Sequence, residues 1–331
     1  MKIMIFLDSK GFGGIETHVE YLARMLMRYN STASIVLWND YGVHPMEEKL
    51  SDIDIPVIKL NGNIRSFVKV LKMSRPDIVH THGYKAGIIG RLICRLMNIK
   101  VISTYHAGDT GRGKMRMYTW LDEVTSWLAP SIAVSRGIFR TLKGQKHCLQ
   151  NFIPVSADWK VVNKNHRVAF VGRLSEEKGA HHFIEIARVC YEQEFHIYGT
   201  GPLEGELKKI APSNVTFHGY VSDMESVWGK VDLLCMPSLN EGTPYAALEA
   251  MAHGIPVLAS DVGGLPHLID HNVNGWCLPI DKPLQFTCKI NAWARLEQGE
   301  RSAMSAAAHY KISRKYSEKS AYPQLMEIYK N

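Results

Sequence analysis

The stretch KIMIFLDSKGFGGIETHVEYLARMLMRY, residues 2–29, has three parts that together indicate one class of fold. The run KIMIFLD (2–8) is short and apolar, as expected for a buried β-strand. The segment SKGFGGI (9–15) contains three glycines, which indicate a turn. The run ETHVEYLARMLMRY (16–29) repeats apolar residues at the spacing of an amphipathic helix. A strand, a turn and a helix in this order begin an α/β domain with a parallel sheet.

The same alternation continues along both halves of the 331 residues, a length that suits two domains. In the first half, strands are predicted at 2–8, 33–38, 56–60, 77–82, 100–106 and 131–135. In the second half, they are predicted at 166–172, 195–199, 214–219, 231–237 and 255–261. We therefore expect two Rossmann-like, doubly wound parallel-sheet domains at 1–150 and 166–316, joined by a linker at 151–165. A last helix at 317–331 is expected to pack back toward the N-terminal domain.

Composition and charge limit the classes of function. No apolar run reaches the roughly 18 residues of a membrane span, and the N-terminal apolar run, which Asp8 ends, is short for a signal peptide. The six cysteines are scattered without a CxxC pair, which is typical of a reducing cytosol. The net charge is +7, but residues 1–150 carry 21 Lys and Arg against 12 Asp and Glu, or +9. The first half is therefore expected to face an anionic partner.

Open parallel sheets bind ligands at the carboxyl ends of their strands. After the first strand, Gly11, Gly13 and Gly14 precede a helix whose N-terminal N–H groups could meet an anion. A dinucleotide fingerprint would need glycine at position 16, where Glu16 stands, so a nicotinamide or flavin site is disfavoured. A tight strand–helix turn without a ligand is the structural alternative.

The segment HAGDTGRGKM (106–115) follows the fifth strand and matches the P-loop spacing at Gly108, Gly113 and Lys114. The next residue is Met115, where a P-loop needs a hydroxyl for magnesium. We favour a flexible basic loop, in which Arg112 and Lys114 meet an anionic acceptor or lipid headgroups.

Three histidines, His80, His82 and His106, fall at predicted strand ends. They could form a metal-binding trio. No acidic ligand stands at a helpful spacing, so we favour a contact between His106 alone and a hydroxyl or phosphate.

In the second half, FVGRLSEEKG (170–179) places Arg173 directly after a strand and Lys178 near a helix start. Two cations beside a helix N-terminus can hold a diphosphate, although both could also be solvated surface side chains. The segments IYGTGP (197–202) and FHGYVSD (217–223) also follow strands. Either could hold a nucleobase through backbone groups.

Two glutamates lie eight positions apart in LNEGTPYAALEAMA (239–252). Thr243 suits a helix N-cap and Pro244 the first helical position, so Glu241 precedes the helix. Glu249 lies inside it among Tyr, Ala, Leu and Met. Burial of an unpaired carboxylate costs several kcal/mol, so Glu249 needs donors. Ribose hydroxyls are suitable, because a carboxylate can accept two at once.

The segment EGTPYAALEAMAHGIPVLASDVGG (241–264) resembles the E-x7-E motif, and the residues after it, of the retaining glycosyltransferases of family 4. GFGGIETHVEYLA, VHTHGYKAG, STYHA, SIAVS, FVGRLSEEKG and IYGTGP fall in that family's order, so the resemblance covers nearly the whole chain. The chain is shorter than is usual for the family, and 39–56 looks abbreviated. DID (52–54), an Asp-x-Asp match, is interpreted as a surface turn.

The resemblance implies the GT-B fold, with two domains facing across a cleft, an acceptor on the first and a nucleotide-diphosphate sugar on the second. Arg173 and Lys178 would neutralise the diphosphate, and Glu249 would hold the ribose. Glu241 and the amides of residues 242–244 would hold the sugar. The expected catalytic residues are Glu241, His106, Arg173 and Lys178. The expected donor site comprises Gly13, Gly14, Arg173, Lys178, Gly199, Gly201, Tyr220, Val221, Glu241, Gly242, Thr243, Pro244 and Glu249. The acceptor-side candidates are Glu16, His18, His82, Arg112 and Lys114.

The expected function is retaining hexosyl transfer from a UDP-sugar, or second a GDP-sugar, to a saccharide or lipid-linked acceptor in bacterial surface polysaccharide or lipopolysaccharide biosynthesis. No metal, cofactor or nucleic acid is expected. Same-face attack is favoured over a covalent Glu241 intermediate, because fixed cations stabilise the departing phosphate. A sugar-nucleotide epimerase, a kinase using 108–114 and a catalytically silent binding protein are the alternatives.

The segment IRSFVKVLKMSR (64–75) places Ile64, Phe67, Val68 and Leu71 on one helical face and basic residues on or beside the other. We expect a helix docked on the sheet. Peripheral contact with an anionic membrane is the alternative that the charge of the first half supports. The expected location is cytoplasmic, at the inner face of the membrane if that contact exists.

Overall fold

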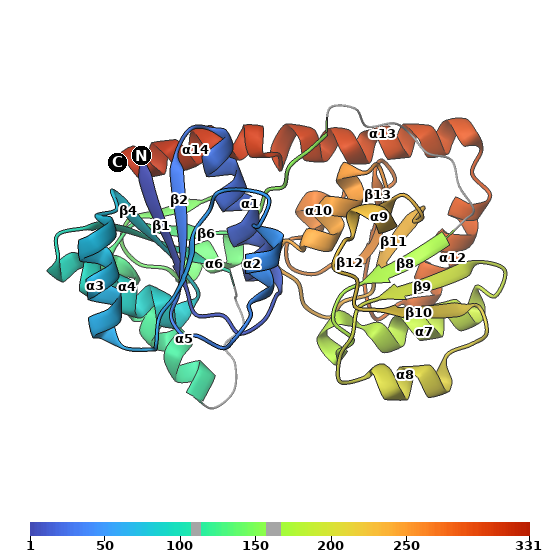
Figure 1. Ribbon diagram of the computed structural model, residues 1–331. Helices are drawn as coiled ribbons and strands as arrows, with labels where there is room; N and C mark the ends of the chain where they lie inside the picture. The colour runs from blue at the N-terminus through green and yellow to red at the C-terminus, as the bar shows by residue number, and fades with distance from the viewer. Residues whose placement is uncertain (107–113, 157–166) are drawn as a thin grey trace. The chain divides into compact units, whose positions relative to one another are not determined.

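The computed structural model describes residues 1–106, 114–156 and 167–331 (Figure 1). Its contacts divide the chain into two compact units. Unit 1 comprises Met1–Pro154 together with Glu318–Asn331, and unit 2 comprises Val155–Ser317. Each unit is built on one parallel sheet, which confirms the predicted fold class.

Unit 1 contains a seven-stranded sheet in which every neighbouring pair is parallel. In spatial order the strands are β3 (Val57–Lys59), β2 (Thr32–Leu37), β1 (Lys2–Leu7), β4 (Ile78–His82), β5 (Lys100–Tyr105), β6 (Ser131–Ala133) and β7 (Lys146–Cys148). The chain runs outward from β1 to β3 and then from β4 to β7 in the other direction. The order therefore reverses between β1 and β4, the place where such sheets bind ligands.

Alternate residues of β1 face the two layers of helices that cover the unit 1 sheet. Ile3 and Ile5 lie in a core with α1 (Gly14–Arg28), α2 (Pro45–Lys49) and α14 (Glu318–Lys330). Met4 and Phe6 lie in a second core with α3 (Ile64–Ser74) and α4 (Tyr84–Leu96). The remaining helices of unit 1 are α5 (Lys114–Val124), the 3-10 helix η1 (Thr125–Leu128) and α6 (Arg136–Thr141). This alternation is the expected result of a strand buried on both faces.

Helix α14 belongs to unit 1 although it ends the chain (Figure 1). Its Leu325 and Tyr329 are buried in the core that α1 and the sheet also form. The hydroxyl of Tyr329 lies 2.6 Å from Nδ1 of His80 in β4. The Arg28 guanidinium at the end of α1 pairs with the buried Glu318 carboxylate. The helix therefore supplies both apolar and polar contacts to residues of the first half of the chain.

Unit 2 contains a six-stranded parallel sheet. In spatial order the strands are β10 (Val215–Gly219), β9 (Glu194–Tyr198), β8 (Arg167–Val171), β11 (Leu233–Met236), β12 (Val257–Ser260) and β13 (Gly275–Leu278). Val168 and Phe170 of β8 are buried against α7 and α12. The helices of unit 2 are η2 (Glu176–Lys178), α7 (Ala180–Val189), α8 (Glu204–Ile210), α9 (Glu225–Trp228), α10 (Tyr245–Ala252), α11 (Leu265–Leu268), α12 (Pro283–Ala294) and α13 (Gln298–Lys315).

The structure corrects three local predictions. Strands β7 and β13 were not predicted, since each is short and lies at an edge of its sheet. Helix α10 begins at Tyr245, and its N-cap is Pro244 rather than Thr243. The loop stays extended through Pro244 because the Gly264 N–H donates to the Gly242 carbonyl and holds the segment before the helix.

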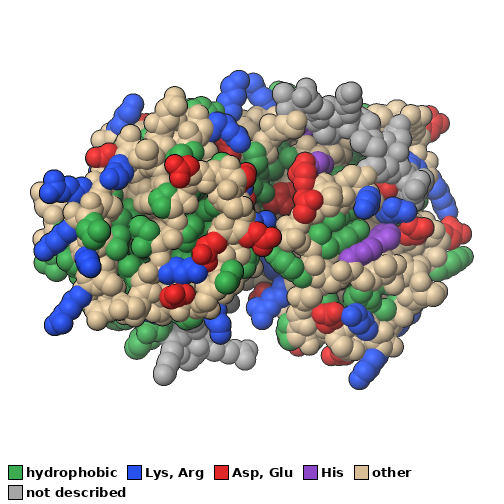
Figure 2. All heavy atoms as spheres, in the orientation of Figure 1, with side chains coloured by type: hydrophobic (Ala, Val, Ile, Leu, Met, Phe, Trp, Pro, Cys, Tyr) green, Lys and Arg blue, Asp and Glu red, His purple; other side chains and the backbone are tan. Residues whose placement is uncertain are grey.

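Helix α3 is amphipathic as predicted, except that Ile64, which was predicted on its apolar face, is 50% exposed. Phe67 and Leu71 are buried, whereas Ile64 and Met73 remain exposed beside four exposed basic residues: Arg65, Lys69, Lys72 and Arg75. Figure 2 shows Lys and Arg side chains along the edge of unit 1 that α3 occupies. No helix among the described residues combines the length and apolarity that a membrane crossing requires.

Candidate active site

Apart from Glu249, the predicted donor-site residues of unit 2 lie in the segments that directly follow β8, β9, β10 and β11. Backbone hydrogen bonds join these loops at the carboxyl edge of the sheet. Leu174 N–H donates to the Thr200 carbonyl at 3.0 Å, and Gly199 N–H donates to the Gly219 carbonyl at 2.7 Å. Leu239 N–H donates to the Glu177 carbonyl at 2.8 Å. The parallel sheet therefore brings four segments that are distant in sequence into one surface.

Lys178 and Glu241 form an ion pair within this surface. The Lys178 Nζ atom lies 2.7 Å from Glu241 Oε2, and the Ser238 hydroxyl donates to Glu241 Oε1 at 2.9 Å. The Glu241 side chain is only 3% exposed, whereas that of Lys178 is 29% exposed. Both carboxylate oxygens of Glu241 therefore have donors, one of them cationic. The sequence did not indicate Ser238, although a polar residue directly after a buried strand was an available signal.

Two glycines allow the backbones that carry this ion pair to approach each other. Gly179, next to Lys178, has a φ of +67°, and a Cβ there would lie 1.8 Å from the Pro237 carbonyl oxygen. Gly263 has a φ of +58°, and a Cβ there would lie 1.7 Å from the Glu241 carbonyl oxygen. Only glycine fits these positions without a backbone shift. The loops after β8, β11 and β12 are thus packed in direct backbone contact.

The glycines after β9 serve a similar purpose. A Cβ at Gly199 would lie 1.9 Å from the Gly172 carbonyl oxygen, and one at Gly201 would lie 2.4 Å from the Leu174 carbonyl oxygen. Their absent side chains therefore let the loop after β9 pack against the loop after β8. Arg173, in this second loop, is exposed.

The other donor-site candidates of unit 2 differ in exposure. Tyr220 is exposed and Val221 is half-buried, both after β10. Gly242 is exposed, and Thr243 is buried directly before α10. An exposed backbone next to a buried hydroxyl residue is suited to offering N–H groups to a ligand.

Glu249 lies in α10 and is half-buried, so the fully buried carboxylate that the sequence indicated is not found. Its negative charge still affects the helix interior. Burial and the Glu249 carboxylate together raise the pKa of Tyr245 well above its ordinary value. A partly exposed carboxylate about one turn into a helix can accept hydroxyl donors from solvent or from a ligand.

In unit 1, the first loop after β1 is exposed at Gly13 and Gly14. The Glu16 carboxylate accepts a hydrogen bond from the Gly13 N–H at 2.9 Å. Glu16 therefore caps its own helix, and one of the N–H groups that could have met an anion already has a partner.

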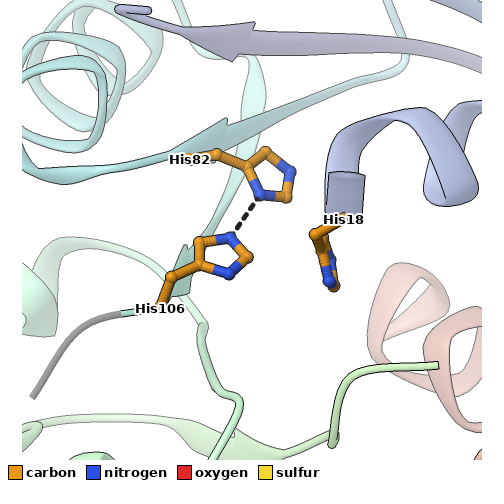
Figure 3. Close-up of side chains that lie close together, drawn as sticks. All are labelled: His18, His82 and His106. Carbon is orange, nitrogen blue, oxygen red and sulfur yellow. Dashed lines mark hydrogen bonds between the residues drawn. The ribbon is translucent and has the colours of Figure 1, made fainter. Parts of the chain in front are cut away.

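The histidines of unit 1 are arranged differently from the predicted trio. His80 is buried in β4, where its nitrogens lie 2.6 Å from the Tyr329 hydroxyl and 2.7 Å from the Thr104 hydroxyl. His82, the last residue of β4, and His106, directly after β5, lie side by side with Nδ1 of His82 2.9 Å from Nε2 of His106 (Figure 3). His18 of α1 takes the place expected for His80 beside them. The Asn151 side chain, which the sequence did not indicate, contacts His18 at 3.2 Å.

Some predicted features lie outside the described residues. Arg112 and the P-loop match at Gly108 and Gly113 fall in 107–113, and most of the predicted linker falls in 157–166. Lys114 begins α5, but its side chain is outside the described part of the structure. DID (52–54) forms a turn as predicted, and the exposed Asp52 carboxylate pairs with Arg24.

Two doubly wound parallel-sheet units are the architecture of the GT-B class of glycosyltransferases. The model of "Glycosyltransferase Family 4" matches residues 12–148, and that of "Glycosyl transferases group 1" matches residues 165–295. The chain therefore belongs to the family 4, group 1 glycosyltransferases, and the predicted family is confirmed.

Two bacterial glycosyltransferases are among the relatives of the chain. The amylovoran biosynthesis glycosyltransferase AmsK of Erwinia amylovora is 35% identical over 181 residues, which are 49% of this chain and 44% of AmsK. This chain thus spans less than half of that relative. The UDP-Gal:alpha-D-GlcNAc-diphosphoundecaprenol alpha-1,3-galactosyltransferase of Escherichia coli is 27% identical over 286 residues, covering 73% of this chain and 72% of that protein.

Solved structures share the fold at low sequence identity. HepE of Anabaena in complex with UDP superimposes with a TM-score of 0.85 at 18% identity, covering 99% of both chains. HepE has also been solved with UDP-glucose, with a TM-score of 0.83 at 19% identity, again covering 99% of both chains.

Proposed function

We propose that the protein transfers a hexose from a UDP-sugar, or second a GDP-sugar, to an acceptor hydroxyl with retention of the anomeric configuration. The observation that carries this proposal is the cation–carboxylate arrangement of Lys178, Glu241 and Ser238 beside the exposed Arg173. HepE, which shares the fold, was solved with UDP and with UDP-glucose, and this supports the choice of nucleotide.

In the proposed reaction, the bond between the anomeric carbon and the diphosphate oxygen breaks while the acceptor oxygen bonds to the same face of the sugar. The acceptor proton passes to the departing phosphate. Negative charge grows on the diphosphate, and Lys178 and Arg173 would stabilise it. Glu241 would hold the sugar hydroxyls. Its two oxygens already accept from Lys178 and Ser238, which supports a role in positioning over one as a covalent nucleophile.

We propose that Glu249 accepts the ribose hydroxyls and that the exposed amides near Gly242 bind the donor. The cations supply the electrostatic stabilisation, so the transfer is proposed to need no metal. Transfer should therefore persist after treatment with a chelator. Loss of transfer that added magnesium or manganese restores would contradict this part of the proposal.

We propose a saccharide or lipid-linked acceptor in bacterial surface polysaccharide biosynthesis. The names of two relatives support this proposal: one acts in amylovoran biosynthesis, and the other is named for a diphosphoundecaprenol-linked acceptor. The exposed cations of α3, together with exposed Ile64 and Met73, support contact with an anionic membrane from unit 1. Co-sedimentation with vesicles containing anionic lipid should fall as salt is raised, and its absence at low salt would remove the membrane contact from the proposal.

The deciding experiment is a calorimetric binding panel of UDP, GDP and their sugars, followed by transfer to a polyprenyl-diphosphate saccharide. An intact donor should bind more tightly than its bare diphosphate. The anomeric configuration of the product is read by nuclear magnetic resonance. Conversion of the donor without acceptor would favour an epimerase, and failure of every donor to bind would overturn the proposed function.

A further inference from the structure

Three histidines of unit 1 converge from separate segments of the chain (Figure 3). His18 comes from α1, His82 ends β4, and His106 follows β5, the parallel neighbour of β4. One ring nitrogen from each lies within 4.8 Å of those of the other two. The ring centroids of His18 and His106 are 4.7 Å apart, and those of His18 and His82 are 5.3 Å apart. In Figure 3 the His18 ring faces the other two across a common space.

The three imidazole rings are wholly or partly buried. His18 and His82 are 3% and 1% exposed, and His106 is half-buried. Desolvation lowers the pKa of His18 to about 4 and lowers the pKa of His82 and of His106 well below the ordinary value. Burial thus disfavours the charged form of all three rings, and neutral imidazole is the form that binds metals.

The hydrogen bonds of the cluster orient the rings. Asn151 Oδ1, which can only accept, lies 3.2 Å from His18 Nδ1, so this nitrogen carries the proton and Nε2 carries the lone pair. A hydrogen bond of this kind on the outer nitrogen is how metal-binding histidines are usually held. Nδ1 of His82 and Nε2 of His106 share a single proton across 2.9 Å.

The His82 ring is incompletely satisfied. Its Nε2 atom is buried and has no hydrogen-bond partner among the described residues. A buried polar nitrogen without a partner is uncommon and costs free energy, so such an atom calls for a ligand or a change of proton position. When a cation binds between His82 and His106, the proton that now joins the two rings would move to the outer nitrogen of its own ring. Each ring would then offer one lone pair to the ion.

We propose that His18, His82 and His106 form a binding site for a divalent transition-metal ion, with zinc as the preferred ion. Within the described residues the cluster contains imidazole alone, without carboxylate or thiolate. Neutral nitrogen ligands favour zinc over magnesium or calcium, which prefer oxygen. Three histidines would leave a fourth tetrahedral position open.

The fit needs a limited rearrangement. Nitrogens about 2.1 Å from a common tetrahedral ion lie about 3.4 Å from each other. Side-chain rotations must therefore close the widest separation, which is at most 4.8 Å. All three ligands belong to unit 1, whereas the ion pair of the proposed donor site belongs to unit 2. The inference therefore does not rest on the proposed function.

The test uses the full-length protein, stripped with a chelator and dialysed, with zinc as the probe. Equilibrium dialysis with elemental analysis should find one zinc ion bound to the wild type. His18→Gln and His82→Gln should each weaken this binding, with a Kd at least 100-fold higher. Asn151→Ala should weaken zinc binding about 10- to 100-fold, because it removes only the outer hydrogen bond. His80→Gln is the matched control: this histidine is buried in the same strand as His82 but bonds Tyr329 and Thr104, so zinc should still bind.

A second test uses cobalt in place of zinc and needs only the wild-type protein. Cobalt bound to the wild type should give the visible absorption of tetrahedral nitrogen coordination without a thiolate charge-transfer band. The proposal is overturned if the wild type binds no zinc, if both histidine variants bind as the wild type does, or if cobalt shows a thiolate band.

Discussion

The Nζ atom of Lys178 lies 2.7 Å from Oε2 of Glu241, although 63 residues separate them in the chain. The two members of this pair differ in exposure, because the Glu241 side chain is almost fully buried and Lys178 is about one-third exposed. Replacing Lys178 should therefore change the free energy of unfolding by a different amount than replacing Glu241.

Lys178→Met should lower the free energy of unfolding by about 3 kcal/mol. The substitution removes one of the two hydrogen-bond donors of the buried Glu241 carboxylate and leaves only Ser238. Glu241→Gln should cost about 1 kcal/mol or less, since Lys178 can turn to water. Urea unfolding of the two variants measures both values. Equal costs would show that the pair is as solvated at Glu241 as at Lys178.

Glu249→Gln should weaken binding of UDP about 10- to 100-fold, because a charged acceptor for two hydroxyls is lost. Isothermal titration calorimetry is the measurement. Glu225→Gln is the control, since this carboxylate of α9 belongs to unit 2 but is largely exposed and paired with His253. An unchanged Kd for Glu249→Gln would remove Glu249 from the nucleotide site.

Gly263→Ala should destabilise the protein by at least about 2 kcal/mol, because the residue has a left-handed conformation and its Cβ would collide with the Glu241 carbonyl. A Cβ at Gly205 in α8 would meet open space, so Gly205→Ala should raise the free energy of unfolding by up to about 1 kcal/mol. Chemical denaturation compares them. A Gly263→Ala variant as stable as the wild type would mean that the loops after β11 and β12 separate easily.

Asp122→Asn should cost about 3 kcal/mol, because Arg91 is fully buried and its guanidinium donates to the Asp122 carboxylate at 2.6 Å. Asp52→Asn removes a carboxylate that also pairs with an arginine, but this one is 62% exposed, so a much smaller loss of stability is expected. The comparison of their unfolding midpoints separates burial from pairing. Similar losses in both variants would contradict the role of burial.

The fold was largely predictable because its signals are local. Most strands of the two sheets are short apolar runs, and most are followed by a turn and a helix with an apolar face. Strand β7 was not predicted because KHC (146–148) has no apolar run. Strand β13 was not predicted because it has only four residues and begins with Gly275.

The site was predictable only in part. Parallel topology places Arg173, Lys178 and Glu241 at one edge, and this follows from their positions after strands. The pairing of Lys178 with Glu241 depends on close backbone packing at Gly179 and Gly263, which no sequence pattern specifies. His18 joins His82 through the packing of α1 on the sheet, and a helix face alone does not select which strand residue it meets.

The return of α14 to unit 1 has a consequence for synthesis on the ribosome. Residues that bury Leu325 and Tyr329 are translated first, but the helix emerges only after Val155–Ser317 has been made. At about 5 to 20 residues per second, this interval lasts roughly 10 to 30 s. During that time the nascent first half exposes an apolar face beside α1, with His80 still lacking the Tyr329 hydroxyl. The part of the protein that is made first is thus completed last, and a chaperone that shields this face would act in that interval.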